Sequence, residues 1–167
     1  MSKLELIRSL FGYNQYANEY LLDETAKLSA EEFSEDRGAS WGSIEANLAH
    51  VTGAQSVWLS RWDGSGKPVA LPDEQNIGGH AAVRDAFAAS HTALRAFVEG
   101  VSEERVNGIF EYADNDGNAR RLPLWLLMVH LMNHGTHHRS EVCMALTAMG
   151  REVKELDLHY FEMERTR

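Results

Sequence analysis

The sequence predicts an all-α fold, a four-helix bundle, from three observations. Apolar residues recur at helical spacing over four long segments, a segment rich in glycine and proline separates the second from the third, and a proline and a glycine bracket the fourth. Of the 167 residues, 44% are hydrophobic and 25% are charged, as in folded globular domains. We therefore expect one domain over residues 1–167, long enough to bury a core without disulfides.

The first two long helices are predicted in the first part of the chain. Apolar residues follow helical spacing over residues 4–28. Ser29 to Glu32 has the form of a capping box, which predicts a short helical turn. Ser40 is the expected N-cap of the second long helix. The three–four spacing of that helix runs through seven positions, six of them apolar: Trp41, Ile44, Leu48, Val51, Gln55, Trp58 and Trp62.

A long connection and a third helix follow. Residues 63–79 are rich in glycine and proline and show little periodicity, which is typical of a surface segment. Loops longer than about 12 to 15 residues are uncommon in compact bundles, and a crossover between parallel helices would need such a reach. We therefore expect a crossover here. The third long helix is predicted over residues 81–101, with apolar side chains along one side.

A small β-hairpin and the fourth long helix are predicted in the last third of the chain. Residues 109–112 and 119–122 flank a turn-forming Asp-Asn-Asp-Gly-Asn cluster, which favours a hairpin. Pro123 suits the first turn of a helix and Gly150 suits the position just past its end. The tail beyond Gly150 keeps apolar residues that can pack back on the bundle: Leu156, Leu158, Tyr160 and Phe161.

Charge and cysteine content argue against several classes of partner. The chain has 16 Lys and Arg against 25 Asp and Glu, a formal net charge of -9, which repels nucleic acids and anionic lipids. The longest apolar stretch, residues 122–131, contains Pro123 and His130 and is about half the length that spans a bilayer. The single cysteine, Cys143, and an N-terminus without the apolar core of a signal peptide lead us to expect a cytoplasmic protein.

A cluster of histidines lies in the fourth helix, at positions 130, 134, 137 and 138. Residues four apart on a helix lie one above the other, about 6 Å apart, so two imidazoles at that spacing can converge on one ion. The pairs 130/134 and 134/138 both qualify. All three rings would span about 12 Å, too far for a single zinc ion. Only one of the two pairs can therefore supply ligands.

Helix geometry favours His134 and His138, together with a third histidine from the second long helix. The apolar side of the fourth helix passes through both residues, so they are expected to face the interior. Buried rings need partners, and a shared cation would satisfy two adjacent rings. His50 lies beside the core position Val51 and one turn before Ala54, which leaves room for a ring. The sequence thus predicts a metal site formed by His50, His134 and His138.

Other interpretations of these residues remain open at this point. An i, i+4 histidine pair arises by chance in a chain with eight histidines, so the spacing alone is weak evidence for a metal. Glu141 is interpreted as part of a solvated helix face, or as a carboxylate that orients a ligand ring. We assign the remaining candidates no ligand role: His130 and His137 as bystanders or supporting groups, His80, His91 and His159 without function, Cys143 as a small buried hydrophobe, and Trp41, Trp58, Trp62 and Trp125 as core.

Several segments resemble the DinB-like (YfiT-like) family of metal-binding proteins. Residues 10–18 resemble the family's Tyr-Asn-x-Trp-Ala-Asn opening, with Tyr16 where tryptophan is common. Residues 129–142 are similar to its His-x-x-Asn-His-Gly-Thr-x-His-Arg-x-Gln-Val pattern almost position by position, and residues 40–50 and 58–62 also match. The sequence departs from the family at Gln55, where an acidic residue is frequent, and at Glu141, where glutamine is common.

The resemblance implies a structure and a set of ligands. It implies an up-up-down-down bundle with a crossover after the second helix, frequent homodimers, and His50, His134 and His138 as the metal ligands. Three neutral imidazoles leave zinc or nickel at least one open position, as in catalytic sites. The absence of a glutamate between His134 and His138 argues against hydrolysis of the His-Glu-x-x-His type.

Three hypotheses about function follow. The first is a metal-dependent enzyme, such as a low-molecular-weight-thiol S-transferase or an isomerase-like enzyme that acts on a small electrophile with a thiol cofactor. The second is a non-catalytic metal-binding or stress-response dimer whose ion fixes the bundle. The third is an interaction bundle without a metal. The sequence assigns no catalytic residue.

Overall fold

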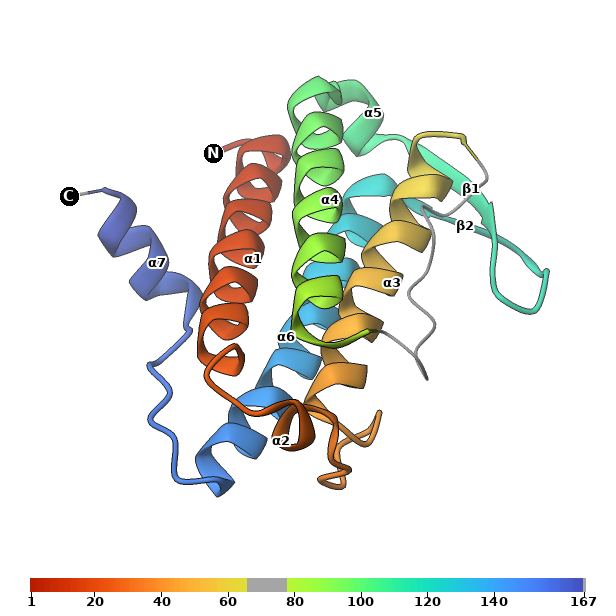
Figure 1. Cartoon of the computed structure of the whole chain (residues 1–167). Coiled ribbons are helices and arrows are strands. Elements are labelled where there is room, and N and C mark those ends of the chain that lie inside the picture. The colour runs from red at the N-terminus through yellow and green to blue at the C-terminus, as the bar shows by residue number, and fades with distance from the viewer. Residues whose placement is uncertain (66–77, 167) are drawn as a thin grey trace.

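The computed structural model describes residues 1–65 and 78–166 (Figure 1). Four long helices, α1, α3, α4 and α6, form a bundle in this part of the chain, which confirms the predicted fold class. Residues 66–77 of the predicted connection lie outside the described residues. The elements in chain order are α1 (Lys3–Thr25), α2 (Ala30–Ser34), α3 (Ile44–Trp62), α4 (Gly79–Gly100), α5 (Glu103–Asn107), β1 (Ile109–Ala113), β2 (Ala119–Pro123), α6 (Leu124–Ala148) and α7 (Leu158–Arg165).

The crossover predicted after the second long helix is confirmed by the directions of α3 and α4. The backbone N–H of Gly79, the first residue of α4, donates to Oε1 of Glu45 in the first turn of α3 at 2.8 Å. The two helices therefore begin side by side and run parallel (Figure 1). The chain has to return from the end of α3 to the opposite end of the bundle before α4 begins.

The predicted up-up-down-down order is wrong. Arg84, near the start of α4, pairs with Asp23, near the end of α1, at 2.8 Å, so these helices are antiparallel. The Lys3 ammonium at the start of α1 lies 5.1 Å from the ring centroid of Trp125 at the start of α6, so these two are parallel. The order is therefore up, down, down, up. The reason is that the single crossover joins the second and third long helices, whereas residues 26–43 reverse the chain between the first and second.

Serines cap the starts of α1, α2, α3 and α5, and the sequence assigned one of these caps to the wrong serine. The capping box of Ser29 and Glu32 is present, as predicted. The N-cap of the second long helix is Ser43 and not Ser40, because Gly42 takes a φ of 76° and turns the chain immediately before the helix. Ser40 is thereby left outside the helix, where its hydroxyl donates to Glu141 at 2.6 Å.

The predicted hairpin is present. Strands β1 and β2 pair antiparallel in a register that runs from Ile109 opposite Pro123 to Ala113 opposite Ala119. Gly117, in the connecting turn, has a φ of 82°, which favours glycine. The hairpin projects sideways from the end of the bundle at which α3 ends and α6 begins (Figure 1).

Two hydrophobic clusters fill the bundle, with a polar layer between them. The first includes the fully buried Trp62 and Met128, and the second includes Phe33 and Phe87. The segments of α1, α3, α4 and α6 between these clusters contribute buried polar side chains, which we call the polar layer: Asn14, Asn18, Thr52, Gln55, Ser56, Ser90, His91, His138 and Arg139.

Arg139 joins α6 to α1 through this layer. Its side chain is buried, with 3% of the residue exposed, and none of the described carboxylates forms an ion pair with it. Its guanidinium donates to Oδ1 of Asn14 at 2.7 Å and of Asn18 at 3.1 Å, and to the Thr136 hydroxyl at 2.8 Å. It also lies against Gly135, where a Cβ would meet Nη1 at 2.8 Å. The two asparagine contacts, which reach from α6 to α1, restrict the rotation of α6 about its own axis.

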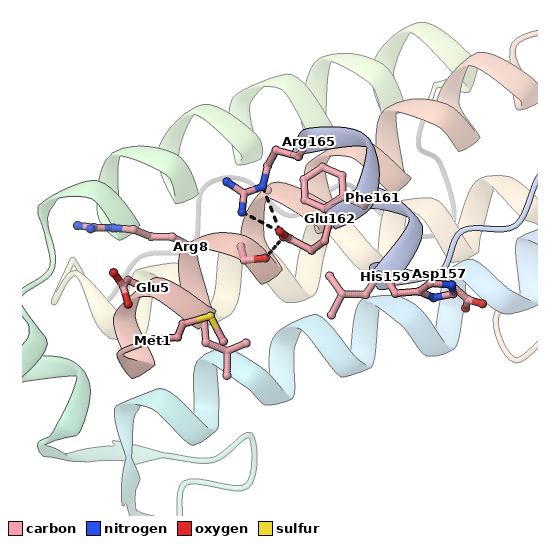
Figure 2. Close-up of a pocket in the computed structure, with 12 residues that line it drawn as sticks. Met1, Glu5, Arg8, Asp157, His159, Phe161, Glu162 and Arg165 are labelled. Atoms are coloured by element: carbon pink, nitrogen blue, oxygen red, sulfur yellow. Dashed lines mark hydrogen bonds and ion pairs between the residues drawn. The ribbon is translucent and has the colours of Figure 1, made fainter. Parts of the chain in front are cut away.

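The C-terminal tail packs on α1, as predicted. The ring of Phe161 in α7 lies 6.0 Å from that of Tyr13 and 5.2 Å from that of Tyr16. An open groove of about 1130 Å³ lies between α7 and the first turns of α1 (Figure 2), and no histidine of the predicted metal site lines it. None of the helices in the described ranges has both the length and the apolar character needed to cross a membrane.

Gly150 ends α6, as predicted, by adopting a left-handed conformation with a φ of 76°. Its N–H donates to the carbonyl of Thr147, and the N–H of Arg151 donates to the carbonyl of Leu146, the two bonds of a Schellman motif. A side chain at this position would be strained. We expect Gly150→Ala to lower the free energy of unfolding by about 1 kcal/mol, measured by urea denaturation. Gly100→Ala, at the end of α4 with a negative φ, is the control and should cause no loss.

His91 lies at the α4 side of the polar layer, with 6% of the residue exposed, and its Nε2 is 3.2 Å from Nδ2 of Asn18. Burial lowers the pKa of His91 from 6.5 to about 4. The unfolded chain therefore takes up the proton first as the pH falls. The stabilisation that a neutral His91 provides is complete above pH 6.5 and is lost as the pH falls towards about 4.

We expect this loss to reach about 3 kcal/mol for His91 alone. The measurement is the difference in unfolding free energy between the parent and His91→Gln, followed from pH 7.5 down to the lowest pH at which both fold. The difference should become less favourable to the parent as the pH falls. A difference that does not change with pH would show that His91 titrates at the same pH in the folded and unfolded chains.

Candidate metal site

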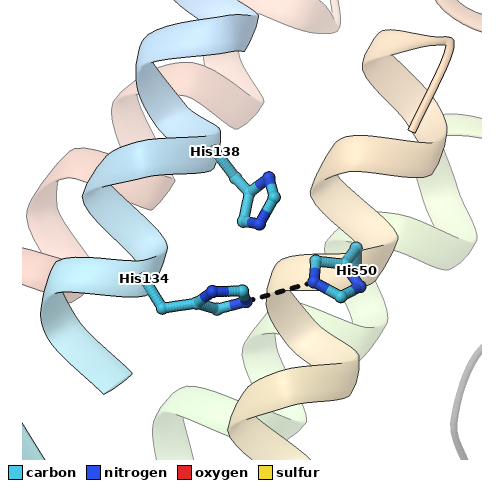
Figure 3. A group of neighbouring side chains, drawn as sticks. All are labelled: His50, His134 and His138. Carbon is cyan, nitrogen blue, oxygen red and sulfur yellow. Dashed lines mark hydrogen bonds between the residues drawn. The ribbon is translucent and has the colours of Figure 1, made fainter. Parts of the chain in front are cut away.

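The three histidines predicted as ligands come together between α3 and α6 (Figure 3). Nε2 of His134 lies 3.1 Å from Nε2 of His50. The ring centroid of His138 lies 4.5 Å from that of His134 and 4.7 Å from that of His50. One nitrogen from each ring lies within 4.8 Å of the others, a grouping able to hold a metal ion.

Two features of the helices produce this grouping. His134 and His138 are one turn apart on α6, so both rings project towards α3. His50 lies near the middle of α3, which runs antiparallel to α6 and faces both rings. His130 and His137 stay outside the grouping. His130 is exposed and packs against Trp58, with ring centroids 5.6 Å apart, and the side chain of His137 is 68% exposed.

The electrostatics of the site favour neutral rings. Burial, followed by the neighbouring rings of His138 and His50, lowers the pKa of His134 to about 4. Burial, followed by the effect of His50, also lowers the pKa of His138. Both rings are therefore neutral at pH 7 and offer lone pairs, which is the form that binds a metal. The donor set of three neutral imidazoles suits zinc, nickel, copper or iron.

Glu141 supports His138, and its interpretation as part of a solvated helix face is wrong. Its side chain is only 20% exposed, and Oε2 lies 3.4 Å from Nδ1 of His138. Oδ1 of Asn47 lies 3.4 Å from the same nitrogen, and the Ser40 hydroxyl lies 3.5 Å from it. Nδ1 thus faces acceptors, while the other nitrogen of the ring faces His134 and His50 (Figure 3). Such a partner fixes both the tautomer and the direction of a ligand ring.

Glu141 also belongs to a second, outer grouping with His137 and His138. The carboxylate lies 3.6 Å from Nε2 of the exposed His137. This grouping would have to take Nδ1 of His138, the nitrogen that faces Glu141 and Asn47. The two groupings therefore share one ring and differ in which nitrogen they use, and the inner one has the more buried donors.

Trp41 lies over the site, which the sequence did not predict. It is 39% exposed and so does not belong to the core, and its ring stacks on that of His50 with centroids 4.0 Å apart and planes 21° apart. The turn at Gly42 places it there. The core assignment is confirmed for Trp62, whereas Trp58 and Trp125 are partly buried at the edge of a cluster. Cys143 is half-buried outside the site, and burial raises the pKa of its thiol.

A groove of about 640 Å³ opens beside the three histidines. Two of them, His50 and His134, line one part of it. A small molecule bound in this groove could therefore reach an ion held by the three rings. The other lining residues come from the segment before α3, from α3 itself, the hairpin and α6: Trp41, Gly53, Ala54, Val57, Trp58, Arg61, Tyr112, Asp114, Asn115, Asp116 and His130.

We expect Glu141→Ala to lower zinc affinity about ten-fold, because His138 loses its main acceptor at Nδ1. Glu141→Gln should lose less, since the amide oxygen still accepts a hydrogen bond. Competition titration against a chromophoric chelator measures the affinity. Glu104→Ala, an exposed carboxylate of α5, is the matched control. Equal affinity in Glu141→Ala and the parent would show that Glu141 does not support the ring.

Comparisons with known proteins agree with this architecture. The chain is 21% identical over 145 residues to Protein DinB of Bacillus subtilis (strain 168), and the alignment covers 84% of each chain. Its fold is similar to that of a conserved protein from Enterococcus faecalis, with a TM-score of 0.69 at 12% identity over 90% of this chain and 99% of the other. It is also similar to a DinB-like protein from Bacillus cereus, with a TM-score of 0.59 at 18% identity over 84% and 90%.

These structural likenesses show the fold, whereas family membership comes from the sequence. The segments that carry the resemblance, residues 10–18, 40–50 and 129–142, contain all three histidines of the grouping and four residues of the polar layer: Asn14, Asn18, His138 and Arg139. The model of the DinB family matches residues 1–167. The chain therefore belongs to the DinB family.

Proposed function

We propose that the protein binds one divalent metal ion through His50, His134 and His138 and uses the open position of the ion to bind a small molecule. The observation that carries this proposal is the convergence of three imidazoles from two helices, with one nitrogen of each within 4.8 Å of the others. Zinc or nickel is the proposed ion, because both accept neutral imidazole ligands. Three protein ligands leave a position open, as in catalytic sites.

The proposed activity is that of a metal-dependent enzyme that uses a low-molecular-weight thiol, such as an S-transferase or an isomerase-like enzyme. A divalent ion here would lower the pKa of a thiol or a water molecule at its open position. The protein residues have the supporting roles. Glu141 and Asn47 fix the ring of His138, Trp41 covers the ring of His50, and the groove beside His134 admits the thiol and the electrophile.

A second candidate is a non-catalytic metal-binding or stress-response protein. The observation that favours it is that the ligands come from two antiparallel helices, so an ion would join α3 to α6 and stabilise the bundle. A homodimer, which the family resemblance implies, is part of both proposals. Metal binding without reactivity towards thiols would favour this second candidate.

Elemental mass spectrometry of protein purified without a histidine tag tests the shared part of both proposals. We expect about one equivalent of zinc or nickel in the parent, and its loss in His50→Ala, His134→Ala and His138→Ala, since two imidazoles bind far less tightly than three. His159→Ala, an exposed histidine of α7, is the matched control and should retain the metal. Metal retained in all four variants would refute the ligand assignment.

A further inference from the structure

The groove beside the three histidines follows one face of α3. His50, Gly53, Ala54, Val57, Trp58 and Arg61 all line it. Their spacing of three and four places them on a single side of the helix, and the 11 positions from first to last correspond to a rise of about 16 Å. The groove therefore has a histidine of the metal site at one end and an arginine at the other.

Arg61 is held in place by aromatic rings and by the hairpin. Its guanidinium carbon lies 4.8 Å from the ring centroid of Trp58 and 5.7 Å from that of Tyr112. Nη2 donates to Oδ1 of Asn115 at 2.7 Å. No carboxylate of the described residues pairs with it, so most of its five N–H donors have no protein acceptor there. A guanidinium oriented in this way is suited to bind a carboxylate through two hydrogen bonds.

Two acidic residues near Arg61 oppose the binding of an anion. Asp114 and Asp116 also line the groove. The charge of Asp114 is offset by Arg120, 2.7 Å away. Asp116 has no such partner in the described part of the chain, so its negative charge opposes an anion at Arg61. The side chain of Asp116 is exposed to solvent, which screens its charge. Its repulsion of an anion is therefore weak compared with the attraction of a direct, hydrogen-bonded ion pair.

The middle of the groove is apolar and aromatic. Gly53, Ala54 and Val57 have small side chains or none, which leaves space along α3, and Trp58, Tyr112 and His130 line it with rings. The ring of Trp58 lies 5.3 Å from that of Tyr112 and 5.6 Å from that of His130. These surfaces suit the uncharged middle of an elongated small molecule.

We propose that this groove binds the thiol of the proposed function, and that Arg61 holds a carboxylate at the far end from the metal. The inference rests on the proposed function and adds a ligand class to it: an elongated organic acid that carries a thiol at one end and a carboxylate at the other. Arg61 contributes to specificity, because it contacts the acid group and none of the reacting atoms.

A matched pair of probes tests the inference. These are 8-mercaptooctanoate and 8-mercapto-octanol, which have the same length and the same thiol and differ in the acid group. Cobalt(II) takes the place of zinc, because zinc is spectroscopically silent and the near-ultraviolet absorption of cobalt reports sulfur ligation. Isothermal titration gives the affinity of each probe. Circular dichroism and cobalt content establish that each variant is folded and loaded.

We expect the parent to bind the mercapto-acid about ten-fold more tightly than the mercapto-alcohol, the gain from one charge-assisted contact. Arg61→Gln should remove this preference and leave the affinity for the alcohol unchanged. Asp116→Asn should increase the preference, since it removes the opposing charge. Arg84→Gln, which also removes a partly exposed arginine but on α4, is the control and should keep it.

The outcomes separate this inference from the proposed function. If both probes give the cobalt–sulfur band with equal affinity, Arg61 holds no carboxylate and the inference fails, while the thiol site stands. If neither gives the band but the acid binds in a manner that depends on Arg61, the anion site stands and the thiol role fails. If neither probe binds at all, the inference fails together with the thiol role in the proposed function, while metal binding by the three histidines is decided by the metal content.

Discussion

The buried guanidinium of Arg139 is the interaction on which the rest of the bundle depends. A buried charge without a carboxylate partner needs several hydrogen-bond acceptors, and Asn14, Asn18 and Thr136 supply them. Removing any one would leave a buried charge poorly solvated, which costs several kcal/mol in comparable cases. Gly135, on the same helix, leaves room for the guanidinium, because a Cβ there would meet Nη1 at 2.8 Å. The hydrogen bonds from Arg139 to Asn14 and Asn18 on α1 restrict the rotation of α6, and thereby the direction in which its neighbouring face projects.

That neighbouring face carries His134 and His138, each one residue before Gly135 or Arg139 in the chain. Gly135 lies between His134 and Thr136 in the chain, and Arg139 directly follows His138, so residues that fix the helix alternate with residues that offer nitrogen lone pairs. Burial keeps the rings of His134 and His138 neutral, so each ring keeps a lone pair on one of its nitrogens. A cation between the rings could accept these lone pairs. The polar layer thus serves the fold on the α1 side and offers a ligand site on the α3 side.

The sequence predicts most of this fold because the signals are local. Periodicity, caps and turn residues predicted the four long helices, the hairpin and the end of α6 at Gly150. The spacing of His134 and His138 predicted that they share a face, and the position of His50 in an apolar face predicted that it joins them. Other long-range contacts were not predictable. The order of helix directions depends on which connection crosses the bundle. The stacking of Trp41 on His50 and the hydrogen bond from Ser40 to Glu141 depend on one turn at Gly42. The groove forms only where the hairpin meets α3, two elements far apart in the sequence.

The hairpin has one further consequence. It projects from the helical bundle (Figure 1) and meets the groove through residues that include Tyr112 and Asn115, while His138 and Arg139 are buried in the bundle. Side chains on its strands and turn can change without disturbing the buried contacts that hold the rings in place. Within such an architecture, the side chains that line the groove can diverge between relatives while the three-histidine grouping stays the same, so the shape of the groove and the donor set are free to evolve separately.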